Sequence, residues 1–247
     1  MERFTTHDGL ELAYLDVGRR DEVILLHGFA ANHEIQWVAP GVVDALREEG
    51  HRVIALDMRG HGESDKPHDP ASYSELAMVR DVQALFEHLG LSSVPVVGYS
   101  MGAHVTARLA PVDARVSRVV LGGVGAHMAS ASAPDGRSAI ADALDAADPA
   151  SIDNPIAKQF RTFADSTGSD RVALAALMRA PRDQERDYSA ISVPTLVLTG
   201  EKDTLAGDPG ELAKLIPGAT FKVVRSDHLR AVFDPAFSRA IVDFVEA

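Results

Sequence analysis

The sequence predicts an α/β protein with a mostly parallel sheet, and three observations support that prediction. Short apolar runs of strand length recur along the chain, and segments with helically spaced apolar residues lie between them. Most of the runs are apolar on both faces, as expected of strands in a sheet that is covered on both sides. Strands that alternate with helices favour parallel pairing through right-handed crossovers.

The composition and charge are those of an ordinary folded protein. Of 247 residues, 46% are apolar and 24% are charged, and a chain of this length buries a core without covalent help. Cysteine is absent, which excludes disulfides, thiolate metal sites and a cysteine nucleophile. The net charge of −12 repels phosphates and anionic lipid headgroups, so neither nucleic acid nor a membrane is expected as a partner.

The chain shows no targeting or membrane segment. Residues 1–8 lack the apolar run of a signal peptide, and no later segment approaches the length of a membrane span. A cytoplasmic location is the expectation that follows from these absences.

The first elements are expected to form an antiparallel hairpin, because residues 3–6 and 10–17 flank the turn residues Asp8 and Gly9. The apolar runs that predict the later strands are residues 23–26, 53–56, 95–97, 119–121, 196–198 and 222–224. Helical patterns outside the middle of the chain lie at residues 42–49, 72–89, 101–110, 211–216 and 237–245.

The pattern at residues 72–89 carries the clearest helix signals. Its apolar residues are spaced to form one stripe. Ser72, with Glu75 three residues later, has the pattern of a capping box, and Gly90 stands where the helix should stop.

The alternation of strands and helices stops between residues 125 and 190. This stretch is rich in alanine, serine and aspartate, prolines divide it, and no strand pattern follows before Pro194. It is expected to form three small helices, at residues 135–147, 156–164 and 171–180. We interpret residues 125–190 as a helical lid inserted over one end of the sheet, and residues 1–124 and 191–247 as the core.

The stretch Gly98-Tyr99-Ser100-Met101-Gly102 joins a predicted strand directly to a predicted helix. So tight a turn crowds the backbone at Ser100, and glycines on either side remove the Cβ atoms that would collide. The Ser100 hydroxyl then lies beside the amino end of the next helix, where free N–H groups stabilise a developing anion. This pattern is typical of a nucleophile elbow, although a structural serine in a glycine turn is the alternative.

A serine nucleophile needs a base and a carboxylate, and the later strands supply both. Asp203 follows the predicted strand at 196–198, and His228 follows the one at 222–224. Both lie after the carboxyl ends of their strands, in the order serine, acid, histidine. We therefore predict Ser100, Asp203 and His228 as the catalytic residues.

Other acids fit this role less well than Asp203. Glu201 leaves the strand two residues early, Asp227 adjoins the histidine, and residues 122–125, after the preceding strand, contain no carboxylate. The oxyanion would be held by the backbone N–H groups of Met101 and Phe29. Gly28 allows the Phe29 loop to turn close to the serine.

With these motifs the chain resembles the α/β-hydrolase superfamily over nearly its whole length, and especially its small serine esterase-like members. The resemblance rests on His27-Gly28-Phe29, on residues 57–64, on the serine elbow, and on the segments around Asp203 and His228. It implies an eight-stranded, mostly parallel sheet flanked by helices, with the lid inserted after the sixth strand. Ala103 departs from the pattern, because many relatives carry glycine there.

The resemblance and the residues together predict a carboxylic ester hydrolase that forms an acyl-enzyme and uses no metal or organic cofactor. Its expected substrates are small to medium, largely neutral esters. Lactonase, C–C bond hydrolase, perhydrolase and acyltransferase activities use the same triad and stay open. Haloalkane dehalogenases and epoxide hydrolases of this fold use an aspartate nucleophile, where this chain has Ser100. A ligand-binding receptor with low turnover is the alternative from another class.

The substrate-binding residues are expected just beyond the catalytic loops: Phe29, Met101, His127, Leu205 and Leu229. Other aromatic residues are expected to pack in the core or lid, namely Trp37, Phe160, Phe163 and Phe233.

Several further polar residues are expected to have structural roles. His27 would support the oxyanion loop, and His61, Asp57 and Asp65 would make local hydrogen bonds in a turn-rich loop. His104 could approach the pocket, but packing is the expected role.

Overall fold

The computed structural model describes residues 1–126, 136–181 and 186–247 and contains an eight-stranded sheet. The strand order is β1-β2-β4-β3-β5-β6-β7-β8. The first two strands, β1 (Glu2–Thr5) and β2 (Glu11–Val17), pair antiparallel, and β2 pairs antiparallel with β4. All the other pairs are parallel. The prediction of a leading hairpin and a mostly parallel sheet is confirmed.

The remaining elements lie close to their predicted positions. The parallel strands are β3 (Arg20–Leu26), β4 (His51–Leu56), β5 (Val94–Tyr99), β6 (Val116–Gly122), β7 (Thr195–Gly200) and β8 (Thr220–Val224). The α-helices are α1 (Val42–Glu48), α2 (Glu75–Leu89), α3 (Met101–Leu109), α4 (Arg137–Asp145), α5 (Pro155–Ser166), α6 (Arg171–Arg179), α7 (Pro209–Leu215) and α8 (Pro235–Glu246).

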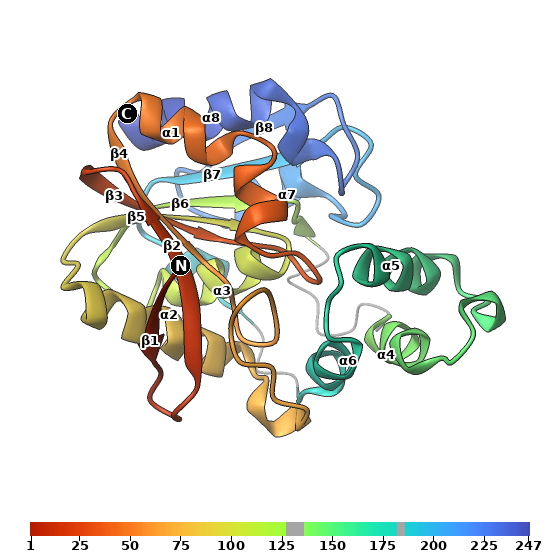
Figure 1. Cartoon of the computed structure of the whole chain (residues 1–247). Coiled ribbons are helices and arrows are strands. Elements are labelled where there is room, and N and C mark those ends of the chain that lie inside the picture. Colours follow the sequence, from red (N-terminus) through yellow and green to blue (C-terminus); the bar gives the residue numbers. More distant parts are fainter. Residues whose placement is uncertain (127–135, 182–185) are drawn as a thin grey trace.

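Helices cover both faces of the sheet (Figure 1). On one face α1 and α8 share an apolar core with Val23 and Leu25 of β3. On the other face α2 and α3 share a larger core with Ile24 and Leu26 of the same strand. Consecutive residues of β3 therefore enter different cores, which explains why the run is apolar at every position.

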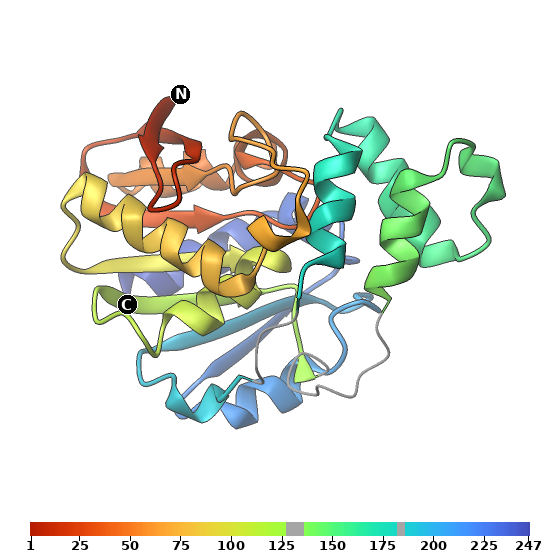
Figure 2. The same cartoon turned by 90° about the horizontal axis from the view of Figure 1, so that it is seen from below.

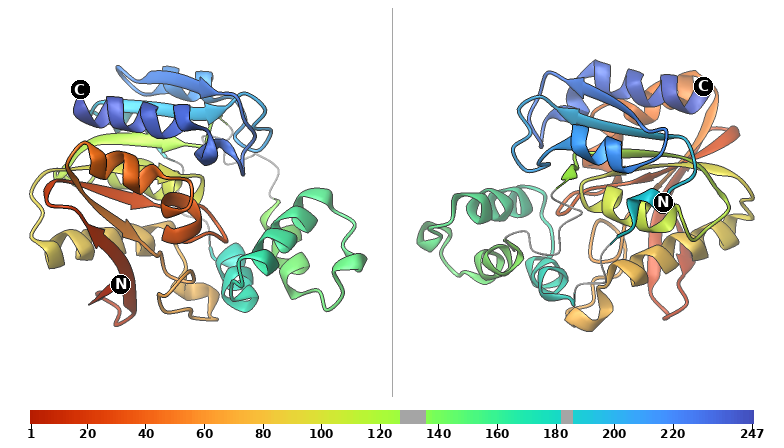
Figure 3. Two further views of the ribbon diagram at one scale, coloured as in Figure 1. Left: turned by 45° about the horizontal axis from the view of Figure 1, so that its top comes forward. Right: turned by 180° about the vertical axis from the view of Figure 1, so that it is seen from behind.

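Helices α4, α5 and α6 lie between β6 and β7 in the chain and form a group beside one end of the sheet (Figures 2 and 3). In that group α4 packs against both α5 and α6. The group also contacts the loop after β3. The Phe160 ring of α5 lies 5.7 Å from the Phe29 ring, and Thr167 Oγ1 donates a hydrogen bond to the Ala30 carbonyl at 3.1 Å.

The start of α2 differs from the sequence prediction. Ser74, not Ser72, precedes the helix with extended backbone, and its Oγ accepts the Ala77 N–H at 3.0 Å. Ser72 instead ends a short 3-10 turn. The predicted capping box with Glu75 is therefore wrong, because that turn shifts the helix start by two residues. Gly90 ends the helix with φ 66°, as predicted.

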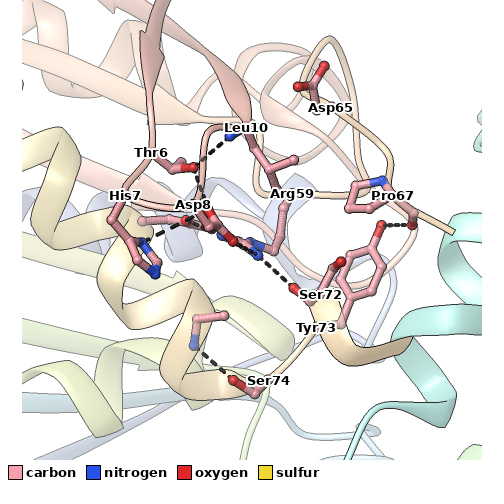
Figure 4. Close-up of polar contacts among 12 residues, drawn as sticks. Thr6, His7, Asp8, Leu10, Arg59, Asp65, Pro67, Ser72, Tyr73 and Ser74 are labelled. Carbon is pink, nitrogen blue, oxygen red and sulfur yellow. Dashed lines mark hydrogen bonds and ion pairs between the residues drawn. The ribbon is translucent and has the colours of Figure 1, made fainter. Parts of the chain in front are cut away.

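A buried guanidinium, that of Arg59, ties the amino-terminal hairpin to the helical layer (Figure 4). It donates two hydrogen bonds to Asp81 of α2, at 2.6 Å each, and two to Asp8 of the hairpin turn, at 2.9 and 3.1 Å. Burial opposes the charge of Asp8, but hydrogen bonds from Arg59 and Thr6 outweigh it and lower the pKa of Asp8 to about 2. Arg59 also donates to the Ser72 carbonyl at 2.6 Å, which fixes the turn before α2.

Replacing Arg59 with methionine should lower the free energy of unfolding by about 3–5 kcal/mol, because the buried Asp81 carboxylate would lose its partner. The more exposed Arg52, paired with Asp16 and Glu22, offers a matched control, and Arg52→Met should cost about 1 kcal/mol or less. Urea unfolding at neutral pH measures both effects. Equal losses in the two variants would contradict the central role given to Arg59.

Candidate active site

Ser100 occupies the sharp turn between β5 and α3. Its φ of 49° and ψ of −109° form a conformation that residues with a side chain rarely adopt. A Cβ atom at Gly98 would lie 2.4 Å from the Gly102 carbonyl oxygen, and one at Gly102 would lie 2.1 Å from the Leu26 carbonyl oxygen. Only glycine fits at either position, which is the physical reason for the Gly-x-Ser-x-Gly pattern.

The loops that follow β5, β7 and β8 meet at one edge of the sheet. Strands β5 and β6 stay paired to their last residues, and so do β7 and β8. Because these strands are parallel, the chain leaves all of them on the same side. Ser100, Asp203 and His228 lie in those loops and come together there.

His228 connects Ser100 to Asp203 through its two ring nitrogens. Its Nε2 lies 3.2 Å from Ser100 Oγ, and its Nδ1 lies 2.8 Å from Asp203 Oδ2. A carboxylate accepts the proton on Nδ1, which leaves Nε2 free to accept the hydroxyl proton. This arrangement can convert a serine hydroxyl into a nucleophile.

Asp203 is held as a carboxylate by its surroundings. Burial opposes its charge, but hydrogen bonds from His228 and from two backbone N–H groups outweigh burial and hold the pKa of Asp203 below its usual value. The backbone donors are Leu205 at 3.0 Å and Ala206 at 2.9 Å, both to Oδ1. An ionised Asp203 fixes the tautomer of the imidazole.

The rival carboxylates lie elsewhere. Glu201 is exposed, and the Asp227 carboxylate accepts the N–H groups of Leu229 at 3.1 Å and Arg230 at 3.0 Å. Neither acid forms a hydrogen bond with the His228 ring within the described part of the chain.

Tyr99, the residue before the serine, supports His228. Its hydroxyl donates to the His228 carbonyl at 2.5 Å, and the two rings lie 5.4 Å apart. A Cβ atom at Gly122 or Gly123 would come within 2.7 Å of the Tyr99 ring, so these glycines make room for it. Sequence reasoning missed this contact, because nothing near Tyr99 in the chain indicates its partner.

Two backbone N–H groups near Ser100 lack a hydrogen-bond acceptor in the described part of the chain. The N–H groups of Phe29 and Met101 donate no hydrogen bond to any residue that the structure describes. The loop that carries Phe29 approaches the serine closely, since a Cβ atom at Gly28 would lie 3.5 Å from Ser100 Cβ. Free donors of this kind can stabilise an oxyanion.

A small pocket of about 50 Å³ lies beside Ser100 and His228. It is mostly apolar, and several of its side chains are aromatic. The residues lining it are Gly28, Phe29, Ile35, Gln36, Tyr99, Ser100, Phe160, Phe163, His228, Leu229, Val232 and Phe233.

Two of the five residues predicted to bind substrate line this pocket. Phe29 and Leu229 line the pocket, whereas Met101 and Leu205 do not. Met101 packs against the main core, and Leu205 lies in the turn that surrounds the Asp203 carboxylate. The fifth predicted residue, His127, lies outside the described residues.

The aromatic walls of the pocket were missed by sequence reasoning. Phe160 and Phe163 come from α5, and Phe233 comes from the short turn after His228. Phe160 and Phe163 also pack against the main core, as expected, whereas Phe233 is 53% exposed. Trp37 is fully buried, as expected of a core residue. His104 does not line the pocket.

Buried imidazoles support the loops behind the pocket. His27 Nδ1 donates to the Gly28 carbonyl at 2.7 Å, and its Nε2 accepts the Met58 N–H at 3.0 Å. His61 Nδ1 donates to the Arg59 carbonyl at 3.0 Å, and its ring packs 4.9 Å from that of His27. Both histidines are fully buried and have the structural roles predicted for them.

The two aspartates of this region also have their predicted roles. Asp57 accepts the backbone N–H groups of His33 at 2.8 Å and Glu63 at 2.9 Å. Asp65 accepts the Glu11 N–H at 2.9 Å.

One group of potential metal ligands exists among the described residues, formed by His7, Asp8 and Asp81. Both carboxylates already bind the Arg59 guanidinium, whose charge opposes a cation, and none of the three lines the pocket. Within the described ranges, no helix has the length and apolar character needed to cross a membrane.

Comparison with known proteins links this site to a large family. The family profile of the alpha/beta hydrolase fold matches residues 22–173. The enol-lactonase from Burkholderia xenovorans LB400 superposes with a TM-score of 0.76 and 26% identity, covering 100% of both chains. A thermophilic esterase from Thermogutta terrifontis superposes with a TM-score of 0.76 and 27% identity, covering 100% of this chain and 98% of that one.

Similarity to curated sequences is more local. Epoxide hydrolase 3 of Siraitia grosvenorii is 35% identical over 96 residues, which cover 39% of this chain and 29% of that protein. The chain thus matches less than a third of that relative's length.

The buried imidazoles predict a loss of stability in mild acid. Burial lowers the pKa of His61 to about 3 from the usual 6.5, and it also lowers the pKa of His27. The unfolded chain therefore binds protons that the folded protein does not. The free energy of unfolding should be greatest above pH 6.5 and fall toward pH 3, with His61 contributing up to about 1.4 kcal/mol per pH unit. His27 adds a loss of the same sign below pH 6.5.

The variant His61→Asn should reduce this pH dependence, because an amide does not titrate. Urea unfolding of both proteins over a series of pH values between neutral and mildly acidic measures the slopes. An undiminished slope in the variant would show that other groups cause the loss.

Proposed function

The chain belongs to the alpha/beta hydrolase fold family, and on that premise we propose that it is a serine hydrolase of carboxylic esters. The observation that carries the proposal is the hydrogen-bonded series from Asp203 through His228 to Ser100, beside an apolar pocket. Hydroxyl, imidazole and carboxylate groups in this order generate a nucleophile in neutral water.

In the proposed reaction, Ser100 Oγ attacks the ester carbonyl while His228 Nε2 accepts the hydroxyl proton. A bond forms between Oγ and the carbonyl carbon, and the carbonyl oxygen becomes an oxyanion. The ionised Asp203 stabilises the imidazolium, and the free N–H groups of Phe29 and Met101 hold the oxyanion.

Collapse of this intermediate breaks the bond to the alcohol, which leaves with the proton from His228. The acyl group remains on Ser100 as an ester. His228 then takes a proton from water, the hydroxide attacks the acyl carbon, and the acid is released as Ser100 regains its proton.

The pocket supports a neutral substrate of limited size. None of its lining residues in the described part of the chain is lysine, arginine, aspartate or glutamate. A cavity of about 50 Å³ holds only a few water molecules, so the part of the substrate bound there is small. The expected substrates are therefore small to medium, uncharged esters.

Helices α4–α6 are proposed to act as a lid over this pocket. Phe160 and Phe163 of α5 form part of its wall, and Thr167 binds the loop that carries Phe29. The lid would then exclude water from the acyl-enzyme and limit the size of the substrate.

Lactone hydrolysis is the second candidate, favoured by the 26% identity to an enol-lactonase over the full length of both chains. It needs the same attack by Ser100 on an ester that is closed into a ring. Epoxide opening is not proposed despite the similarity to epoxide hydrolase 3, because that chemistry in this fold is expected of an aspartate at position 100.

An active-site label with a substrate panel tests the proposal directly. A fluorophosphonate should modify Ser100 alone, as located by mass spectrometry, since only an activated serine reacts rapidly. The panel should contain esters, lactones and thioesters of graded chain length. Labelling elsewhere, or no turnover of any substrate in the panel, would refute the proposed function and leave a ligand-binding receptor as the better reading.

Changing Ser100 to alanine should lower kcat/KM for a short ester by at least about a thousandfold, because the nucleophile is lost. The melting temperature should change little, since alanine also bears a Cβ at this strained position. Steady-state kinetics and thermal unfolding measure the two quantities, with Ser238→Ala on α8 as a control that keeps full activity. Nearly complete activity in Ser100→Ala would refute the mechanism.

Changing Asp203 to asparagine should lower kcat on the order of a thousandfold or more, because the amide no longer enforces the productive imidazole tautomer. Glu201→Gln is the matched control, because it makes the same carboxylate-to-amide change at an exposed side chain two residues before Asp203. It should leave kcat within about twofold of the wild-type value. A larger loss in Glu201→Gln than in Asp203→Asn would show that the acid is misassigned.

A further inference from the structure

Gln36 lies in the candidate pocket, next to the loop that approaches the serine. It belongs to a single turn of π-helix, Glu34–Val38, between β3 and α1. The residue is 7% exposed and lines the pocket together with its neighbour Ile35. A Cβ atom added at Gly28 would lie 3.3 Å from Gln36 Oε1 and 3.5 Å from Ser100 Cβ. The Gln36 amide and Ser100 therefore flank Gly28 in the lining of the same pocket.

The two ends of this amide have different environments. Oε1 accepts the Gly28 N–H in a long hydrogen bond of 3.4 Å. The amide nitrogen, Nε2, donates to no residue in the described part of the chain. Nε2 keeps access to solvent, because it is not one of the fully buried polar atoms that lack a partner, although the residue as a whole is 7% exposed. A substrate oxygen that displaced water from Nε2 would accept a hydrogen bond from it.

The turn that carries Gln36 is fixed in place. Asn32 Oδ1 accepts the Ile35 N–H at 2.9 Å at the start of the turn, and the next residue, Trp37, is fully buried in the core. His33 is held by Asp57, whose Oδ1 accepts the backbone N–H of His33 at 2.8 Å and the N–H of its ring Nδ1 at 2.9 Å. Gln36 is thus presented by a rigid backbone, as expected of a group that selects a ligand, and single π-helical turns occur often at functional sites.

The other side chains in the pocket indicate what kind of ligand atom can accept a hydrogen bond from Gln36. Phe29, Phe160, Phe163 and Phe233 supply apolar surface, and the described lining contains no cation that would bind a carboxylate or phosphate. Besides the catalytic Ser100 and His228, Tyr99 is the other polar side chain there, and its hydroxyl donates to the His228 carbonyl. The matching ligand atom is an uncharged oxygen on a mainly apolar molecule.

We propose that Gln36 is a specificity-determining residue that donates a hydrogen bond to a second, uncharged oxygen of the substrate near the scissile carbonyl. The preferred substrates are then esters of oxygen-substituted acids or alcohols, such as alkoxy, hydroxy or oxo compounds, rather than simple alkyl esters. This inference rests on the proposed ester hydrolysis at Ser100.

Two pairs of nearly isosteric esters test the proposal. 4-Nitrophenyl methoxyacetate and 4-nitrophenyl butanoate differ by one oxygen in the acid, and 2-methoxyethyl acetate and butyl acetate differ by one oxygen in the alcohol. For each pair the ratio of kcat/KM values is measured in the wild-type protein and in Gln36→Met. Comparing ratios between proteins cancels the intrinsic reactivity of each ester.

Gln36→Met should reduce the preference for the oxygen-containing member of one pair by about threefold to tenfold, the effect of one hydrogen bond. The pair that responds shows whether the acid or the alcohol carries the recognised oxygen. Gln36→Glu keeps an acceptor for the Gly28 N–H but has no N–H donor when ionised, so its ratio should fall as well. The same change at the exposed Gln159 of α5, Gln159→Met, should leave both ratios unchanged.

Equal loss of kcat/KM for both members of each pair would overturn the inference, because it would mean that Gln36 only supports the loop at Gly28. Unchanged ratios in both variants would overturn it as well. In either case the wild-type protein still hydrolyses esters, so the proposed function stands. If the wild-type protein hydrolyses none of the four esters and resists the fluorophosphonate, the proposed function fails and the inference fails with it.

Discussion

The strained turn at Ser100 is the constraint on which the rest of the site depends. A residue with a side chain at φ 49° costs about 1–3 kcal/mol, and surrounding contacts must hold it there. Those contacts are backbone atoms of β3 and α3, which approach so closely that glycine alone fits at positions 98 and 102. The same close approach sets the Phe29 loop against the serine, and the N–H groups of Phe29 and Met101 have no acceptor among the described residues. The strained turn, the two N–H groups and the Ser100 hydroxyl are therefore parts of one packing arrangement.

The parallel sheet brings the remaining groups to this turn. Ser100 and His228 are 128 positions apart in the chain, yet their side chains lie within hydrogen-bond distance because β5 and β8 end at the same edge. Tyr99 reinforces this placement by binding the His228 backbone from β5 itself. The position of His228 is thus coupled to β5, the strand that leads to Ser100, and not only to the loop after β8.

Buried polar groups keep the loops behind the pocket in place. His27 and His61 remain neutral because burial disfavours their charged forms, and their ring nitrogens bind backbone groups of neighbouring loops. Arg59 remains charged when buried, because its guanidinium forms ion pairs with Asp8 and Asp81 from two separate segments. The pocket wall is mostly apolar, and Gln36 adds a side-chain amide to it beside Ser100 and His228.

The sequence by itself determined the sheet, the turn at Ser100, and the placement of Asp203 and His228 after the ends of β7 and β8, because these depend on local apolar runs, glycine sterics and strand ends. The sequence misplaced the start of α2. Both Ser72 and Ser74 can cap a helix, but Ser72 belongs to the 3-10 turn before α2, so Ser74 is the cap. The sequence predicted Phe29 and Leu229 at the pocket, but only the tertiary structure decided the rest of its lining. Phe160 lies against the ring of Phe29 because the helical group docks on that loop, and Gln36 comes from the π-helical turn between β3 and α1. Contacts between distant segments leave no periodic pattern in the chain, so such side chains are identified only when the fold brings them together.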